Sequence, residues 1–279
     1  MLVIPYAQTS TFYYITQLDL ANNHLRAIVD SVIGFDTEFT LRAIPEHECI
    51  AMLLTPTSKN ARRQYQIARM RSFPQGMPVD WVGAGICTVQ IARGRNVFII
   101  NLKRIQAFPF ELRRILESLR IRKVGTGFLA DGKVIFEDLG CNVANFVDVG
   151  HMIRLAHPEK YALHSGKVSL ETCVAHLLER YLDKGLGAAT KWDETLDPTA
   201  IEYAGLDAQA SLHVFFAASE HLRQKQNALG RIIPEDWYTY DFFEGSATRI
   251  VRNYLGERCP WSYTICPWYV AGAFSNYHM

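Results

Sequence analysis

Apolar residues gather in short runs that have the length of buried strands, with polar or glycine-containing turns between them. Residues 31–39 form one such run and end in a pair of acids. Residues 85–92 and 96–102 form two more, and Arg93-Gly94-Arg95 between them has the spacing and chemistry of a hairpin turn. The pattern therefore predicts three strands in antiparallel order.

Further along the chain, apolar residues recur every three or four positions, which indicates helices. The segment that begins at Pro109 has this spacing through Leu119, and proline is favourable at a first helical position. Short strands are expected at 122–126 and 145–149, with a helix at 129–139 between them. Two later helices are predicted from capping signals, one beginning after Ser169 and one opened by Asp197-Pro198 and extending to about residue 217. The order β-β-β-α-β-α-β predicts a mixed sheet with helices packed on it.

Three segments lie outside this pattern. Residues 1–29 form an N-terminal lead-in to the domain predicted at 30–221. Residues 41–84 form a long insertion within that domain, and connections of this length are usually functional or mobile. Residues 222–279 form a C-terminal extension whose last part is rich in aromatic residues. We expect one of the two longer segments to contact a protein partner.

Composition narrows the class of protein only slightly. A hydrophobic content of 49% is ordinary for a globular chain, and a net charge of +1 argues against a polybasic carrier. The six cysteines form no CxxC pair, so we interpret them as buried thiols in a reducing compartment. No signal-peptide core and no apolar stretch long enough for a membrane span is present. We expect a soluble intracellular protein of the nucleus or cytoplasm, without membrane contact.

The first candidate for chemistry is the pair Asp36 and Glu38, at the end of the first strand. Side chains two positions apart on a strand point to the same face, so the two carboxylates lie side by side. Two like charges on a half-buried strand repel each other and lose hydration, unless a cation or proton compensates. A divalent metal ion is the natural compensation. Taken alone, the pair is also compatible with a solvated strand end.

The second candidate is the pair Tyr203 and Asp207 on the predicted last helix. Residues four apart on a helix share a face, so the phenol and the carboxylate project together at the edge of the apolar stripe. In isolation the pair is better explained by a packed tyrosine ring beside an exposed acid. A third acid, Asp131, follows a glycine-containing turn at 125–127, where it has either a catalytic role or that of a helix N-cap.

Taken together, FDTEF, KVGTGFLAD and YAGLD resemble the three exonuclease motifs of the DEDD superfamily, in this order and with these separations. The motifs resemble those of ribonuclease D and of the exonuclease domain of the Werner-syndrome helicase. SLETCVAHLLERYLDK, before the third motif, is also similar to that subgroup. The residue five positions before Asp207 is Glu202 and not a histidine, whereas Tyr203 lies four positions before it. The chain therefore resembles the tyrosine branch, called DEDDy.

The resemblance implies a ribonuclease-H-like α/β fold, with a mixed five-stranded sheet flanked by helices. It also implies 3′→5′ exonuclease activity that releases nucleoside 5′-monophosphates. By motif match, Asp36, Glu38, Asp131 and Asp207 would hold two Mg²⁺ or Mn²⁺ ions at the scissile phosphate. The Tyr203 hydroxyl would orient the attacking water, since a phenol pKa near 10 suits a positioning group better than a base.

Substrate contacts must come from other residues, because four carboxylates repel a phosphate backbone. We expect a 3′-ended DNA or RNA strand to meet basic side chains and stacking aromatic rings. The candidates are Phe39, Phe128, Arg122, Lys123, Lys133, Lys167, Arg62 and Arg63. An alternative to the enzyme is a catalytically silent nuclease-like module that binds nucleic acid or acts as a scaffold.

Overall fold

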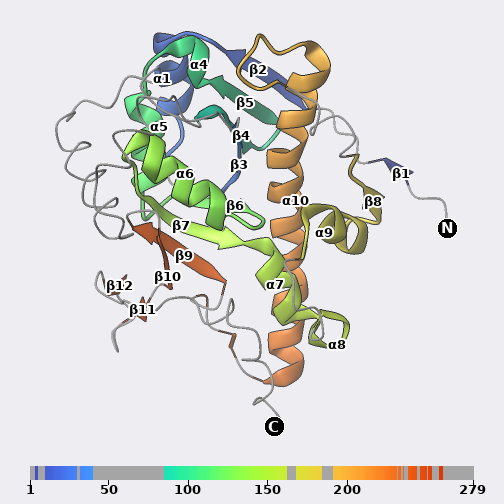
Figure 1. The fold of residues 1–279 in the computed structure, drawn as a ribbon. Helices are drawn as coiled ribbons and strands as arrows, with labels where there is room; N and C mark the ends of the chain where they lie inside the picture. The colour runs from blue at the N-terminus through green and yellow to red at the C-terminus, as the bar shows by residue number, and fades with distance from the viewer. Residues whose placement is uncertain are drawn as a thin grey trace, which may run out of the picture.

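The structure is a computed structural model of the chain (Figure 1). It describes residues 4–5, 10–29, 32–39, 85–161, 168–183 and 191–230, and short segments between 232 and 259. The insertion predicted at 41–84, with Arg62 and Arg63, lies outside the described residues. Lys167 and the aromatic residues near the C-terminal end lie outside them too.

An eight-stranded mixed sheet forms the centre of the molecule, in the order β10-β9-β7-β6-β3-β4-β5-β2. Strand β3 pairs antiparallel with β4 and parallel with β6. The strands are β2 (Thr11–Ile15), β3 (Val32–Phe39), β4 (Ile86–Arg93), β5 (Asn96–Asn101), β6 (Arg122–Gly125), β7 (Val143–Asp148), β9 (Thr239–Phe243) and β10 (Ser246–Arg249). Two further pairs join β1 (Ile4–Pro5) to β8 (Arg180–Tyr181) and β11 (Val251–Arg252) to β12 (Arg258–Cys259).

The five strands predicted from the sequence form the middle of this sheet, in the order β5-β4-β3-β6-β7. The two antiparallel pairs and the hairpin between β4 and β5 are confirmed. The mixed α/β, ribonuclease-H-like fold is confirmed as well. The sheet differs in having three more strands, because β2 adds to β5 at one edge, and β9 and β10 extend the other edge beyond β7.

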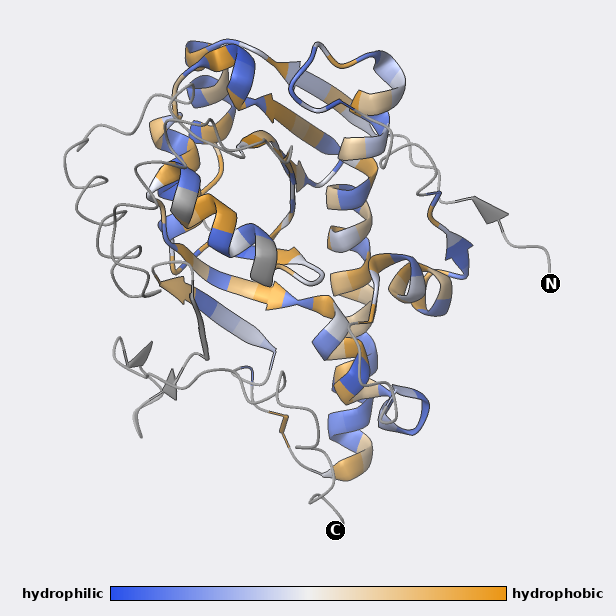
Figure 2. Ribbon diagram, in the orientation of Figure 1, coloured by the Kyte–Doolittle hydropathy of each residue, from blue (hydrophilic) through white to orange (hydrophobic). Residues whose placement is uncertain are grey.

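Helices cover both faces of the sheet. They are α1 (Leu18–Arg26), α4 (Leu102–Ile105), α5 (Phe110–Glu117), α6 (Leu129–Leu139), α7 (Val149–Ala156), α8 (Pro158–Tyr161), α9 (Leu170–Leu177) and α10 (Pro198–Leu229). The long α10 packs across β3, β4, β5 and β6 and against α7. In Figure 2, strands β5 and β7 are mostly apolar, whereas α10 carries both apolar and polar residues.

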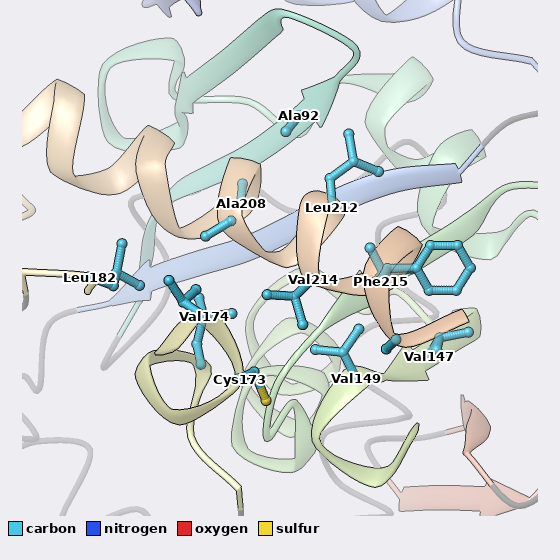
Figure 3. Close-up of a cluster of buried hydrophobic side chains, with 14 of the residues drawn as sticks. Ala92, Val147, Val149, Cys173, Val174, Leu182, Ala208, Leu212, Val214 and Phe215 are labelled. Atoms are coloured by element: carbon cyan, nitrogen blue, oxygen red, sulfur yellow. The ribbon is translucent and has the colours of Figure 1, made fainter. Parts of the chain in front are cut away.

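The sheet separates two apolar cores, and successive residues of β3 face one core and then the other. Ile33 and Phe35 are buried in the core beneath α1, α5 and α6. The intervening Gly34 faces α10 on the other side of the sheet, where the second core lies. Figure 3 shows part of that second core, with α10 residues such as Leu212 and Val214 beside side chains from β7, α7 and α9.

The helix signals in the sequence are largely confirmed. Ser169 accepts a hydrogen bond from the backbone of Thr172, and Asp197 caps α10 with Pro198 in its first turn. The helix predicted from Pro109 ends at Glu117, so Leu119 lies outside it and is 55% exposed. Helix α10 is longer than predicted, continuing to Leu229, since it also packs on α7.

Both segments predicted to flank the domain contribute to its core. On the N-terminal side, Ala21 and Leu25 of α1 are fully buried, and β2 is a strand of the main sheet. On the C-terminal side, Tyr240 and Phe242 of β9 are buried against β7 and α6. Within the described ranges, no helix combines the length and the apolar character needed to cross a membrane.

Candidate active site

Three of the predicted carboxylates come together between β3 and α10. Asp36 and Glu38 project from the α10 face of β3, and Asp207 projects from α10. Each of the three offers an oxygen, and these oxygens all lie within 4.8 Å of one another. Asp36 and Glu38 are half-buried, whereas Asp207 is buried. Three negative groups so close together, and largely out of water, form a strong site for a cation.

Gly34 explains why α10 lies close enough to β3 for this arrangement. A Cβ atom at Gly34 would come within 1.9 Å of the Ala208 carbonyl oxygen, so only glycine fits there. Ala208 is the neighbour of Asp207 on the helix, and Gly34 is two positions before Asp36 on the strand. The missing side chain therefore brings Asp36 and Asp207 together.

Tyr203 lies one helical turn before Asp207 on α10, as the sequence predicts. Its ring is half-buried and lies 6.1 Å from the ring of Trp192, measured between centroids. Trp192 is itself buried, just before the start of α10. The contact with Trp192 limits the positions that the phenol can take, and the phenol stays on the same side of the helix as the carboxylate.

The fourth predicted carboxylate, Asp131, approaches β3 from the opposite side. It lies in the first turn of α6, and its Oδ1 atom accepts a 2.6 Å hydrogen bond from the Thr37 hydroxyl. Thr37 lies between Asp36 and Glu38 and points to the other face of the strand. Asp131 is not the N-cap of α6, since Phe128 occupies that position. The strand thus has two carboxylates on one face and contacts a third on the other.

Two of the predicted substrate contacts are wrong because the side chains lie inside the protein. Lys123 is fully buried, and its Nζ donates hydrogen bonds to the carbonyl oxygens of Ile115 at 3.0 Å and Ser118 at 2.8 Å. Phe128 is only 3% exposed and stacks on Phe146 with 4.0 Å between ring centroids. Neither side chain can meet a phosphate or a base without leaving its place in the core.

The position of Arg122 also argues against a contact with substrate. Arg122 is paired with Val32 at the start of β3, four residues before Asp36, which corresponds to about 13 Å along a strand. Its Nη2 atom lies 3.2 Å from both carboxylate oxygens of Glu235. By contrast, Phe39 is half-buried directly after Glu38, and Lys133 is exposed two residues after Asp131. Substrate contacts at these two residues remain predictions.

A further acid, Asp148, holds the backbone directly before α6, and it was not among the residues predicted from the sequence. Its Oδ2 accepts a 3.1 Å hydrogen bond from the Gly127 backbone N–H, and its Oδ1 accepts one from His151 N–H at 3.2 Å. An acid between a strand and a helix is a recognisable N-cap signal. The contact with Gly127 is not foreseeable from the sequence, because it joins segments about twenty residues apart.

Three of the cysteines are confirmed as buried free thiols, namely Cys87, Cys141 and Cys173. Burial, with a smaller contribution from the charge of Asp148, raises the pKa of the Cys173 thiol far above its usual range. Burial likewise raises the pKa of Cys141. Thiols of this kind stay protonated, so they act as packing groups and not as nucleophiles.

The chemistry of the three-carboxylate cluster fits Mg²⁺ or Mn²⁺. Both ions prefer oxygen ligands, and Asp36, Glu38 and Asp207 offer only carboxylate oxygens, close enough together to share an ion. Within the described part of the chain, no other group of three acidic, histidine or cysteine side chains meets the same distance criterion. Asp131 lies outside this group of three, and its hydrogen bond with Thr37 links it to the strand that carries Asp36 and Glu38.

A comparison with protein-family models agrees with this geometry. Residues 77–223 match the family described as 3′-5′ exonuclease, which is more than half of the chain. The chain belongs to the 3′-5′ exonuclease family. The matched region includes Asp131, Tyr203 and Asp207, whereas Asp36 and Glu38 precede it and are brought to Asp207 by the fold.

One curated protein is similar to the chain in sequence, and solved structures share its fold. "Exonuclease 3′-5′ domain-containing protein 2" of Drosophila melanogaster is 24% identical over 157 residues, 54% of this chain and 26% of that protein. The catalytic core of RRP6 from Trypanosoma brucei has a TM-score of 0.57 at 16% identity, over 82% of this chain and 52% of its own. The Nibbler EXO domain of Aedes aegypti has a TM-score of 0.53 at 17% identity, over 77% of this chain and 92% of its own. The chain therefore spans about half of the RRP6 chain and a quarter of the Drosophila protein.

Proposed function

We propose that this member of the family is a metal-dependent 3′→5′ exonuclease of the DEDDy type. It would hydrolyse phosphodiester bonds from the 3′ end of a DNA or RNA strand and release nucleoside 5′-monophosphates. The observation that carries the proposal is the meeting of Asp36, Glu38 and Asp207 within 4.8 Å at the junction of β3 and α10. Three mutually repelling carboxylates, half-buried at Asp36 and Glu38 and buried at Asp207, cost free energy without a cation, which supports a metal-dependent enzyme over a catalytically silent fold.

Two Mg²⁺ or Mn²⁺ ions are the cofactors that these residues suit. Asp36, Glu38 and Asp207 would hold them, and Asp131 would contribute from the α6 side. When bound, such ions supply positive charge for the phosphate and lower the pKa of water. The carboxylates of the chain then have two tasks, which are to fix the positions of the ions and to exclude a phosphate backbone until the ions are present.

Tyr203 would position the attacking water. The phenol lies on the same helical face as Asp207, one turn away, and Trp192 restricts its ring. A phenol is both a donor and an acceptor of hydrogen bonds. Its hydroxyl can therefore donate one hydrogen bond and accept another, which orients a water molecule without removing its proton.

The 3′ strand would approach the site over Phe39 and Lys133. Phe39 directly follows Glu38 and is partly exposed, so its ring is available for a terminal base to stack on. Lys133 lies two positions after Asp131 on the exposed side of α6 and would contact a phosphate. The insertion at 41–84, with Arg62 and Arg63, and Lys167 would supply further contacts, and 41–84 or 222–279 would bind a protein partner.

The experiment that tests the proposal is a time course on 5′-labelled single-stranded DNA and RNA oligonucleotides with Mg²⁺, Mn²⁺ or EDTA. The expected result is a one-nucleotide ladder that shortens from the 3′ end, absent in EDTA and in the Asp36→Ala and Asp207→Ala variants. Glu202→Gln is the matched control, since Glu202 is exposed beside Tyr203 on α10 and should leave the ladder intact. Binding of the oligonucleotide without any ladder would instead indicate a catalytically silent module.

A further inference from the structure

We infer that Thr37 is a positioning residue whose hydroxyl fixes the orientation of the Asp131 carboxylate. The inference rests on the proposed function, because it concerns the carboxylate expected to complete the ion site. Thr37 would touch neither ions nor substrate, and would act only through Asp131. The hydrogen bond between Thr37 and Asp131 links the part of the site on β3 with the part on α6.

The location of Thr37 explains why its hydroxyl bonds to Asp131. Thr37 is 4% exposed and points to the same face of β3 as Ile33 and Phe35, which are in the apolar core. A hydroxyl buried beside apolar side chains costs free energy unless it forms a hydrogen bond. Asp131 Oδ1 accepts that bond at 2.6 Å, which is within the usual range for a hydroxyl donor.

The backbone around Asp131 is held by other contacts. Before the helix, the Gly127 N–H donates to Asp148. One residue after Asp131, Gly132 lies so close to Phe242 that a Cβ atom would come within 2.4 Å of the ring. Because these contacts fix the first turn of α6, removal of the Thr37 hydroxyl should leave the helix in place. The change would be confined to the direction in which the Asp131 carboxylate points.

Carboxylates that hold ions are commonly oriented by a hydrogen bond from a neighbouring group, and loss of such a group typically lowers metal affinity or activity about 10- to 100-fold. Thr37 matches this role because its hydroxyl donates a hydrogen bond to the Asp131 carboxylate. Substrate affinity should not depend on it, since Thr37 is buried on the face away from Asp36 and Glu38. The expected signature is weaker ion binding at unchanged oligonucleotide affinity.

The test uses the full chain and measures Mn²⁺ binding by isothermal titration calorimetry without substrate. Thr37→Val should weaken Mn²⁺ binding about 10-fold and raise the Mg²⁺ concentration for half-maximal activity by a similar factor, with KM for the oligonucleotide unchanged. Thr37→Ser should restore both values, because it retains the hydroxyl. Thr239→Val is the matched control. Thr239 is a buried strand threonine whose hydroxyl makes no hydrogen bond within the described residues.

A double-mutant cycle with Asp131→Ala separates positioning from packing. If Thr37 acts through Asp131, then Thr37→Val should cause no further loss of Mn²⁺ affinity in the Asp131→Ala background. Thermal unfolding in EDTA checks that each variant is folded, and Thr37→Ala replaces Thr37→Val in the cycle if the valine does not fit. Wild-type Mn²⁺ affinity in the folded variant, additive losses in the cycle, or no rescue by serine would each overturn the inference.

These outcomes are distinguishable from failure of the proposed function. A wild-type protein that binds Mn²⁺ but forms no ladder would refute the exonuclease activity, while the calorimetric titration still decides the role of Thr37. A wild-type protein that binds no Mn²⁺ would overturn both proposals together.

Discussion

The ring of Phe242 lies directly against the backbone of Gly132. A Cβ atom built on Gly132 would be 2.4 Å from Phe242 Cδ1, far closer than carbon atoms can approach. Phe242 belongs to β9, beyond the region 77–223 that matches the exonuclease family, whereas Gly132 follows Asp131 within it. Strand β9 therefore limits how close the first turn of α6 can lie to the sheet.

Gly132→Ala should consequently damage the protein even though alanine favours helices. The methyl group would push α6 away from β9, and overpacking of this kind costs about 1–3 kcal/mol. We expect lower stability in urea unfolding together with a lower kcat, because Asp131 moves with the helix. Gly132→Ala combined with Phe242→Leu should recover part of both losses, since leucine leaves more space. Unchanged stability and kcat in Gly132→Ala would contradict the close contact.

The central part of the fold was predictable because short-range patterns determine it. Apolar runs marked β3, β4 and β5, and capping residues such as Ser169 and Asp197 marked the helix starts. The pairing of Asp36 with Glu38, and of Tyr203 with Asp207, follows from the periods of strand and helix alone. These features need no knowledge of distant contacts, which is why the sequence was sufficient for them.

The outer strands and the burial of Lys123 depend on contacts that form only when the chain folds. Strands β2 (TFYYI) and β9 (TYDFF) are aromatic-rich runs of five residues each, but such a short run does not indicate that it pairs with an edge of the main sheet. Lys123 was predicted to contact substrate because lysine is rarely buried. Its ammonium group is satisfied by two carbonyl oxygens from the end of α5, and only the folded chain brings these near.

Asp36→Asn should stabilise the ion-free protein while it abolishes activity. The variant removes one of three neighbouring negative charges, and repulsion at these distances is worth about 1–3 kcal/mol near a protein surface. We expect a higher free energy of unfolding than wild type in EDTA, and a smaller gain in stability on adding Mg²⁺. Asp193→Asn, at an exposed position before α10, serves as the control and should change neither quantity. A less stable Asp36→Asn in EDTA would argue against repulsion in the cluster.

Lys123→Met should lower the stability of the protein, whereas Lys133→Met should raise KM for the oligonucleotide. Lys123→Met leaves the Ile115 and Ser118 carbonyl oxygens without their donor, so stability should fall by about 1–3 kcal/mol with no change in KM for the oligonucleotide. Lys133→Met removes an exposed charge near Asp131, so KM should rise while stability stays within about 0.5 kcal/mol of wild type. Urea unfolding and initial rates at several oligonucleotide concentrations distinguish the two. A raised KM in Lys123→Met would show that the lysine leaves the core to reach substrate.

Three histidines lie together beside the C-terminal half of α10, namely His157 directly after α7, His176 in α9 and His221 in α10. His157 Nε2 lies 2.7 Å from His221 Nδ1, and the His157 and His176 rings are 4.7 Å apart. Glu159 lies 3.4 Å from His157 Nδ1 and also near Lys225. Burial first, and then the neighbouring His221, lowers the pKa of His157 below its usual value, despite the opposing charge of Glu159. Burial likewise lowers the pKa of His176, with a contribution from Lys160.

This cluster predicts a loss of stability in mild acid. Between the lowered folded pKa and the ordinary value near 6.5, the unfolded chain binds more protons than the folded one. Stability should therefore be constant above about pH 7 and should fall as the pH drops below about 6.5. Urea unfolding between pH 5.5 and 7.5 measures this slope, and His157→Gln should reduce it, because glutamine cannot take up the proton. An identical slope in wild type and His157→Gln would assign the acid sensitivity to other groups.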